Sequence, residues 1–415
     1  MTDYGLLGEH LGHSYSTFIH EAFGFYRYEM KETAPQDVAD FMMRREWKGI
    51  NVGIPYKKTV LPYCDIVSER VKKIGATNTV KKLPDGRFFA DNTDYTGFEY
   101  MSRKAGVDFA GKNCVIFGHG GASLACAAVI RDHGGSVRFV DLMRGEGHND
   151  PVYLYSELDQ LKDAEIAVNT TPVGMYPETD ASIVRLADLP KLTAALDVVY
   201  NPLNTRFIQE AKALGLPNAS GLSMLVAQAK RSCEIFLDTK LADSVIEDVL
   251  KKLEDSVRNI VLIGMPGCGK NTVGQALAAE LGMRFADIDE EIRRRVGKSA
   301  EEIILTEGEA AFRVLEAQTA QELCREKGTV IACGGGIVKD PSNYARLCQN
   351  GTIVWLMRDL DKLATDGRPL SKGGAALEQL WNERSSLYDR FSDIKVDNNG
   401  TVSETLSQIR RILDI

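Results

Sequence analysis

The clearest chemical signal in the sequence is a glycine-rich segment that ends in a lysine. It reads Gly264-Met-Pro-Gly-Cys-Gly-Lys270, which matches the pattern G-x-x-x-x-G-K. An apolar, strand-like run precedes it and a helix-like stretch follows it. In such a loop, backbone N–H groups surround phosphate oxygens, while the lysine and the helix N-terminus supply positive potential. A glycine-rich turn with a surface lysine is the structural alternative, but the placement favours a site for the phosphates of ATP.

The residues expected to hold Mg²⁺ beside this loop include one departure from the usual pattern. The motif has Ser or Thr after the lysine, whereas this chain has Asn271, followed by Thr272. An amide oxygen is an acceptable hard ligand, but this side chain is longer than a hydroxyl, so the metal would be held differently, through water, or weakly. Asp287 and Asp289 follow a short strand, where they would serve Mg²⁺ and a substrate hydroxyl. The structural alternative makes Asp289 the N-cap of the next helix.

A second glycine-rich segment lies earlier in the chain. Gly118-His-Gly-Gly-Ala-Ser123 is an imperfect G-x-G-x-x-G, again between a strand-like run and a helix-like stretch. A glycine-rich turn without a cofactor is the alternative. The next strand ends at Asp141, about 20 residues after Gly120, where a carboxylate suits the ribose hydroxyls of NAD. Arg144 would instead meet the 2′-phosphate of NADP, so the sequence leaves the choice between the two dinucleotides open.

The elements that must position these loops follow a repeated βα pattern. Residues 1–100 alternate short strands with helices, 101–221 contain nearly continuous apolar strands typical of a sheet covered on both faces, and 222–255 read as closing helices. The pattern resumes from 256, after a polar segment at 251–258 with little or no flexible linker. The predicted strands are 4–8, 50–54, 77–81, 87–90, 114–117, 137–141, 165–169, 195–199, 259–264, 330–332 and 353–356.

This order predicts an α/β protein with two functional halves. The first half, 1–255, would combine an N-terminal α/β substrate domain (1–100 with 222–255) and a Rossmann-like NAD(P) domain (101–221). The second half, 256–415, would be a P-loop α/β domain with a parallel sheet, which the family resemblance given below implies is a kinase domain. A length of 415 residues is sufficient for two or three domains.

Composition restricts the class of protein further. The net charge is -8, and no block of Lys and Arg is present, which argues against nucleic-acid or membrane-surface partners. No apolar run approaches the roughly 18–20 residues that span a bilayer. The eight cysteines form no C-x-x-C pair, and the six histidines form no metal-binding pair. We therefore expect a cytoplasmic protein with reduced thiols and no transition-metal site.

Motifs outside the first glycine loop carry a family resemblance. They include His13-Ser-Tyr-Ser16, the lysine in Asn51-Val-Gly-Ile-Pro-Tyr-Lys57, and Asp91-Asn-Thr-Asp94. Over residues 4–236 the chain resembles shikimate dehydrogenase. The resemblance implies that Lys57 and Asp94 are the catalytic pair. It further implies a substrate site made of Ser14, Ser16, Asn78, Asp94, Tyr200 and Gln228, and a cofactor site made of Gly118, Gly120, Gly121, Ala122, Asp141 and Arg144.

The implied reaction transfers hydride between a nicotinamide and the ring carbon that bears a 3-oxo group. Lys57 would donate or accept the proton on that oxygen, and Asp94 would hold the lysine. The chain departs from the family pattern at Gly53, which replaces a threonine, at His119, and in the run from Asp141 to Arg144. The family favours NADP, whereas Asp141 favours NAD.

Residues 256–415 resemble shikimate kinase in the order and spacing of several motifs. These are the P-loop, the segment from Gly308 to Glu316, the run Gly334-Gly-Gly336, the segment from Asp366 to Leu370, and Arg384. The resemblance implies a shikimate site in which an aspartate orients the attacking hydroxyl and guanidinium groups clamp a carboxylate. Its residues would be Asp289, Arg313, Gly334, Gly335, Gly336 and Arg384, with Lys270 and Asp289 catalytic.

The same resemblance implies a nucleotide site with Mg²⁺. Its residues would be Gly264, Gly267, Gly269, Lys270, Asn271, Thr272 and Arg368, with Asn271 and Asp287 holding the metal. The lid segment from Arg358 to Arg368 is short for the family, and it lacks an adenine-stacking arginine between Leu363 and Arg368.

The combined prediction is a bifunctional enzyme of the shikimate pathway. It would reduce 3-dehydroshikimate to shikimate with NADP(H), and then phosphorylate shikimate with ATP and Mg²⁺ to give shikimate 3-phosphate. The alternative is an NAD-dependent quinate/shikimate dehydrogenase that carries a weakly active or non-catalytic P-loop module. The sequence makes no prediction of the oligomeric state.

Overall fold

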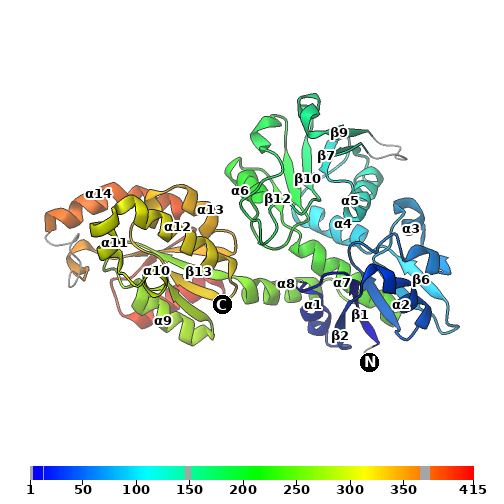
Figure 1. Cartoon of the computed structure of the whole chain (residues 1–415), viewed down its shortest axis with the longest axis horizontal. Coiled ribbons are helices and arrows are strands. Elements are labelled where there is room, and N and C mark those ends of the chain that lie inside the picture. Colours follow the sequence, from blue (N-terminus) through cyan, green and yellow to red (C-terminus); the bar gives the residue numbers. More distant parts are fainter. Residues whose placement is uncertain (1–2, 13, 145–150, 365–373) are drawn as a thin grey trace. The chain divides into compact units, whose positions relative to one another are not determined.

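The chain folds into two compact units. The computed structural model describes residues 3–12, 14–144, 151–364 and 374–415 (Figure 1). The first unit extends to Leu253 and the second comprises Glu254–Ile415. This division falls inside helix α8 (Ser244–Val257), which is followed after a single residue by strand β13 (Asn259–Ile263). The polar segment at 251–258 is therefore mostly helical.

The first unit begins with a mixed sheet in the order β2-β1-β3-β5-β6-β4. Strands β1, β2 and β3 are parallel, whereas β5 runs antiparallel to both β3 and β6. The prediction of strand 50–54 was too long, because β3 ends at Val52 and a turn from Gly53 to Tyr56 follows. The elements are β1 (Tyr4–Gly8), α1 (Ser16–Ala22), β2 (Tyr28–Glu32), α2 (Val38–Arg44), β3 (Gly49–Val52), β4 (Ile66–Val67), α3 (Glu69–Ile74), β5 (Thr79–Lys82) and β6 (Phe88–Asp91).

The second sheet of this unit is parallel throughout, in the order β12-β11-β10-β7-β8-β9. Alternate residues of β7 point to opposite faces: Cys114 and Ile116 join one apolar cluster, and Val115 and Phe117 join another. The strand order reverses between β7 and β10, which is where dinucleotides bind in doubly wound folds. The strands are β7 (Asn113–Phe117), β8 (Ser136–Asp141), β9 (Val152–Leu154), β10 (Ile166–Asn169), β11 (Ala194–Asp197) and β12 (Asn218–Ala219).

The long helices of the first unit join its two sheets. Helices α4 (Asp94–Lys104) and α7 (Leu222–Leu237) pack against each other, and α5 (Gly121–Asp132) packs against α4. Helix α7 is buried along most of its length, because it lies between neighbours instead of on the surface. Helix α6 (Arg206–Ala213) follows β11.

The second unit has one parallel five-stranded sheet in the order β14-β15-β13-β16-β17. The glycine-lysine loop follows β13, the central strand. A single apolar core surrounds the sheet. The remaining elements are α9 (Lys270–Leu281), β14 (Arg284–Asp287), α10 (Ile288–Val296), α11 (Ala300–Glu307), α12 (Glu309–Arg325), β15 (Thr329–Ala332), α13 (Ser342–Leu347), β16 (Gly351–Met357), α14 (Gly374–Phe391), β17 (Ile394–Asp397) and α15 (Val402–Leu413).

All eight cysteines are free thiols, and seven of them are buried. Among the described residues, no helix has the length and apolar character needed to cross a membrane.

Candidate active sites

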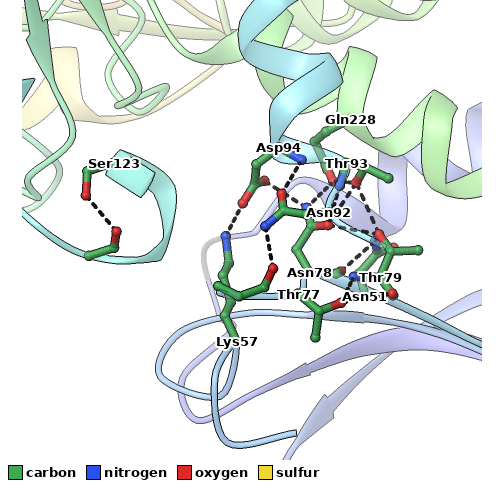
Figure 2. Close-up of polar contacts among 12 residues, drawn as sticks. Asn51, Lys57, Thr77, Asn78, Thr79, Asn92, Thr93, Asp94, Ser123 and Gln228 are labelled. Carbon is green, nitrogen blue, oxygen red and sulfur yellow. Dashed lines mark hydrogen bonds and ion pairs between the residues drawn. The ribbon is translucent and has the colours of Figure 1, made fainter. Parts of the chain in front are cut away.

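The centre of the first site is a largely buried ion pair. Lys57 Nζ lies 2.5 Å from Asp94 Oδ2, and only 16% and 9% of the two side chains are exposed (Figure 2). Lys57 stands in the turn that follows β3, and Asp94 is the first residue of α4. The end of a strand and the start of a helix thus fix the two groups from different sides. The pair holds an ammonium group at the edge of the sheet, where it can transfer a proton.

The second oxygen of Asp94 is held by an amide network. Asn78 Nδ2 donates to Asp94 Oδ1 at 2.8 Å and approaches Gln228 Oε1 at 3.4 Å. The Asp94 backbone N–H donates to Asn92 Oδ1 at 3.1 Å, which fixes the start of the helix. Figure 2 shows Asn78, Gln228 and Lys57 gathered around this carboxylate. The structure therefore brings together four of the predicted residues from separate segments of the chain.

Further buried polar groups hydrogen-bond to the side chain of Asn78 and to its neighbours. Asn78 Oδ1 accepts hydrogen bonds from the Thr93 backbone N–H at 2.7 Å and from Thr79 Oγ1 at 3.0 Å. Ser232, on α7, lies 2.9 Å from Thr79 Oγ1 and accepts from Asn51 Nδ2 at 2.7 Å. Sequence reasoning missed Thr79 and Ser232, because their contact joins distant parts of the chain and no local pattern marks it.

Ser14, Ser16 and Tyr200 form a separate polar group. Ser14 Oγ donates to Ser16 Oγ at 3.0 Å. Burial raises the pKa of Tyr200, and a hydrogen bond with Ser14 acts in the opposite direction. The rings of Tyr15 and Tyr200 lie 5.5 Å apart. These contacts bring residues from the start of the chain to the segment that follows β11.

The glycine loop lies beside the lysine. Gly120 is the N-cap of α5 and has no side chain with which to cap the first amide groups of the helix. A Cβ atom on Gly121 would lie 3.2 Å from Lys57 Cδ. Gly118 has a φ of +92°, and a Cβ there would lie 2.9 Å from Thr171 Cγ2, so only glycine fits. Ala122 follows Gly121 in the first turn of α5. The loop therefore presents backbone N–H groups where the strand order of the sheet reverses, which fits a dinucleotide diphosphate.

The two residues that would discriminate NAD from NADP both contact other groups of the protein. Asp141 ends β8, and its Oδ1 accepts from the Leu142 backbone N–H at 2.6 Å. Arg144 forms an ion pair with Glu157, whose other oxygen accepts from the Leu154 backbone N–H at 2.8 Å. Sequence reasoning missed Glu157, which holds Arg144 through this ion pair.

Asp197, at the end of β11, is fully buried. Its oxygens accept from Thr205 Oγ1 at 2.5 Å, from Asn169 Nδ2 at 3.0 Å and from the Val199 backbone N–H at 3.0 Å. Burial raises the pKa of this carboxyl to about 7. The aspartate thus joins the carboxyl ends of β10 and β11 to the start of α6.

The loop of the second unit has the backbone conformation that phosphate binding needs. Gly264, Gly267 and Gly269 have φ values of +144°, +84° and +95°. Lys270 opens α9, and its buried ammonium donates to the carbonyl oxygens of Gly264 at 2.9 Å and Met265 at 3.0 Å. The lysine therefore lies inside the loop, where it can move from carbonyl oxygens to the oxygens of a bound phosphate.

Asn271 and Asp287, the predicted metal ligands, are in contact. Asn271 Nδ2 donates to Asp287 Oδ2 at 2.5 Å, and Thr272 follows in the first turn of α9. Asp287 Oδ1 accepts from the Glu290 backbone N–H at 3.0 Å, so Asp287 caps α10 and the alternative that assigned the cap to Asp289 was wrong. Within the described residues, no three His, Cys, Asp or Glu side chains gather as a metal cluster. The pair still fits Mg²⁺, which takes few protein ligands besides water and phosphate oxygens.

The substrate residues predicted for the second unit surround the Gly334–336 run. A Cβ on Gly334 would lie 3.1 Å from Asp289 Oδ1, and one on Gly336 would lie 2.2 Å from Arg313 Nη2. Arg384 Nη1 donates to the Gly335 carbonyl oxygen at 3.1 Å. The glycines therefore let the two guanidinium groups and the aspartate approach the backbone closely.

Glu316 is a member of this site that sequence reasoning missed. It is fully buried, and its Oε2 accepts from Arg313 Nη1 at 2.5 Å. A Cβ on Gly334 would lie 2.7 Å from its Oε1, so Glu316 is close to Asp289. Burial raises the pKa of Glu316 to about 7, although Arg313 opposes that shift. The spacing of three residues from Arg313 on one helix was the available signal.

The nucleotide end of the site is partly described. Arg368 lies outside the described residues, as does the predicted lid beyond Ala364. Arg358 Nη1 donates to the Asn398 carbonyl oxygen at 3.2 Å, and Asn398 Nδ2 donates to the Cys268 carbonyl oxygen at 2.5 Å. The P-loop is thereby tied to the ends of β16 and β17.

These two sites define two enzyme classes in one chain. A doubly wound domain with a lysine–aspartate pair beside its glycine loop is typical of a dinucleotide-dependent oxidoreductase. A P-loop next to an aspartate and two arginines is typical of a small-molecule phosphotransferase.

Comparison with known proteins gives the family. The shikimate dehydrogenase substrate binding domain matches residues 6–80, and shikimate kinase matches residues 266–414. A shikimate dehydrogenase (NADP(+)) from Clostridium perfringens (strain SM101 / Type A) is 34% identical over 267 residues, covering 60% of this chain and 98% of the relative. The chain therefore belongs to the shikimate dehydrogenase family and carries a shikimate kinase domain. It is a bifunctional enzyme of the shikimate pathway, as the sequence predicted.

Solved structures agree with this assignment. Shikimate dehydrogenase 1 from Peptoclostridium difficile is 33% identical with a TM-score of 0.57, covering 61% of this chain and 98% of that one. Shikimate 5-dehydrogenase from Thermus thermophilus, solved with NADP(H) and shikimate, is 30% identical with a TM-score of 0.55, covering 61% and 99%. The predicted α/β fold class is confirmed.

Proposed function

We propose that the first unit reduces 3-dehydroshikimate to shikimate with NADPH. The observation that carries this proposal is the Lys57–Asp94 pair, 2.5 Å apart and directly beside the glycine loop. A ketone reduction needs a hydride on carbon and a proton on oxygen, and the ammonium of Lys57 supplies the proton. When bound, the dinucleotide supplies the hydride.

The surrounding side chains have supporting roles in this proposal. Asp94 holds the lysine and, with Asn78 and Gln228, binds ring hydroxyls of the substrate. These roles are supported by the 2.8 Å contact between Asn78 Nδ2 and Asp94 Oδ1. Ser14, Ser16 and Tyr200 would bind the substrate at its other end. Their hydroxyl groups can accept and donate, as a polyhydroxy acid requires.

The second unit would phosphorylate the 3-hydroxyl of shikimate. When bound, ATP supplies the phosphoryl group. Asp289 would orient the attacking hydroxyl and accept its proton, and Lys270 would hold phosphate oxygens. Arg313 and Arg384 would clamp the carboxylate, a role supported by their close approach to the Gly334–336 backbone. Asn271 and Asp287 would hold Mg²⁺ directly or through water.

Separate assays test the two halves. NADP reduction with shikimate should fall by a factor of about 10² to 10⁴ in Lys57→Met, while shikimate-dependent ADP release continues. Lys270→Met should give the reverse pattern. Loss of both activities in either variant, with both units still folded, would contradict the assignment of the sites.

A second candidate is an NAD-dependent quinate/shikimate dehydrogenase with a weakly active P-loop module. The observation that favours it is the position of Asp141 at the end of β8, together with the ion pair of Arg144 and Glu157. The Asp141 carboxylate would repel a 2′-phosphate, and Glu157 holds the arginine that would otherwise bind that phosphate. Comparison of kcat/KM for NAD and NADP, with shikimate and with quinate, decides between the two candidates.

A cytoplasmic location stays a prediction. It is supported by the eight free cysteines, which are typical of a reducing compartment.

A further inference from the structure

Two carboxylates of unequal exposure share the guanidinium group of Arg313. Glu316 Oε2 lies 2.5 Å from Nη1, and this carboxylate is fully buried. Glu309 Oε1 lies 2.9 Å from Nη2 and 3.3 Å from Nε, and half of its side chain is exposed. Glu309 therefore occupies the side-on edge of the guanidinium, which is one of the edges that can bind a carboxylate through two hydrogen bonds.

A lysine offers Glu309 a second partner. Lys339 ends the short helical turn that follows Gly336, and its Nζ lies 2.8 Å from the same oxygen, Glu309 Oε1. Hydrogen bonds from Lys339 and Arg313 lower the pKa of Glu309 to about 2, so this carboxylate is ionised near neutral pH. A hollow of about 310 Å³ lies over the group and is lined by Glu309, Ala310, Arg313, Lys339 and Asp340.

We propose that Glu309 competes with the substrate carboxylate for Arg313, and that Lys339 draws Glu309 away so that the substrate can bind. The inference rests on the proposed role of Arg313 in shikimate binding. A glutamate on the guanidinium edge must be displaced or must share that edge when a second carboxylate arrives. Because Lys339 already contacts the same oxygen, the displaced carboxylate keeps a charged partner. Glu309 and Lys339 are thus opposing determinants of affinity for the acid.

The test measures the KM for shikimate in shikimate-dependent ADP release by the full chain at saturating ATP. This readout comes from the second unit alone, whereas calorimetry would also register the proposed shikimate site of the first unit. The variants are Glu309→Gln, Lys339→Met and the double variant. Both side chains are substantially exposed, so the fold should tolerate the changes. The control is Glu322→Gln, which removes the same charge from α12 at an exposed position paired with Arg295.

Glu309→Gln should tighten shikimate binding and Lys339→Met should weaken it, each by about two- to five-fold, since partly exposed ion pairs are weak. Once Glu309 is absent, the Lys339→Met change should have no further effect, and Glu322→Gln should behave as the unchanged chain. Unchanged or weaker binding by Glu309→Gln overturns the inference, as does an unchanged affinity in Lys339→Met. A Lys339→Met effect that persists without Glu309 also overturns it, because the lysine would then bind the substrate itself. If the unchanged chain releases no ADP with shikimate, the proposed kinase function fails together with the inference.

Discussion

Gly121 lies against the side chain of Lys57, so that a Cβ atom on the glycine would be 3.2 Å from Lys57 Cδ. The first belongs to the loop expected to hold the dinucleotide, and the second is the proposed proton donor. The hydride source and the proton source therefore meet at one place, between the mixed sheet and the doubly wound sheet of the first unit. A ketone bound at this place can receive the hydride on its carbon and the proton on its oxygen.

Lys57→Met should lower kcat of the dehydrogenase by a factor of about 10² to 10⁴, because no side chain then exchanges a proton with the substrate oxygen. The measurement is NADP reduction at saturating shikimate. Lys58→Met is the matched control, since the neighbouring lysine is exposed and should be dispensable. Equal rates in the two variants would exclude Lys57 from the reaction.

Asp197→Asn should change how stability depends on pH. Below about pH 4 the carboxyl is protonated in both the folded and the unfolded states. Between about pH 4 and pH 7 only the unfolded chain releases the proton, because burial raises the folded pKa to about 7. Wild-type stability therefore falls as pH rises through this window, by at most about 1.4 kcal/mol per pH unit from this group.

The variant should lack that loss, so its midpoint of thermal unfolding should gain on the wild type between pH 4 and pH 7. Calorimetry of the first unit's transition measures it. Asp159→Asn, at an exposed aspartate paired with Lys162, should track the wild type across the window. A constant offset between Asp197→Asn and wild type would show that the carboxyl ionises normally.

Gly336→Ala should weaken shikimate binding to the kinase domain. The φ of Gly336 is -103°, which alanine adopts easily, so the backbone is not the obstacle. The new Cβ would lie 2.2 Å from Arg313 Nη2 and must push the guanidinium aside. We expect the KM for shikimate to rise by about tenfold, the loss of one charge-assisted hydrogen bond, while the KM for ATP stays constant. An unchanged KM for shikimate would place its carboxylate elsewhere.

Asn271→Ser should raise the affinity of the kinase domain for Mg²⁺. In the structure Asn271 Nδ2 donates a hydrogen bond to Asp287 Oδ2 at 2.5 Å. A serine would leave this carboxylate oxygen available to the metal and would offer a shorter hydroxyl ligand. Kinase rate measured against free Mg²⁺ at fixed ATP should saturate at a several-fold lower concentration. The same half-saturation in both proteins would show that residue 271 does not approach the metal.

The sequence predicted the parts of the fold that have strong local signals. Apolar strands such as Asn259–Ile263, followed by glycine loops, identified both βα entry units because glycine patterns and strand runs are local features. The edge strands Tyr28–Glu32 and Ile66–Val67 were missed, since one is polar and the other has only two residues. The N-cap of α10 was assigned two residues too late because Asp287 and Asp289 are equally suitable by type.

The sites show the same division. Glycines, lysines and aspartates within motifs were named as candidates, and the structure brings Lys57 to Asp94 and Asn271 to Asp287. The glutamates that form ion pairs with the candidate arginines, Glu157, Glu309 and Glu316, were not identified. An isolated glutamate carries no local signature, and its importance appears only once the folded chain places it against Arg144 or Arg313.

The central claim is that one chain performs two consecutive steps. The most direct test incubates the purified chain with 3-dehydroshikimate, NADPH, ATP and Mg²⁺ and follows shikimate 3-phosphate by chromatography. We predict that the product forms, that omitting NADPH abolishes it, and that Lys57→Met slows its formation by a factor of about 10² to 10⁴. Omitting ATP or using Lys270→Met should leave shikimate instead. Accumulation of shikimate with ATP present and no phosphorylated product would contradict the account, and would leave a dehydrogenase joined to an inactive P-loop domain.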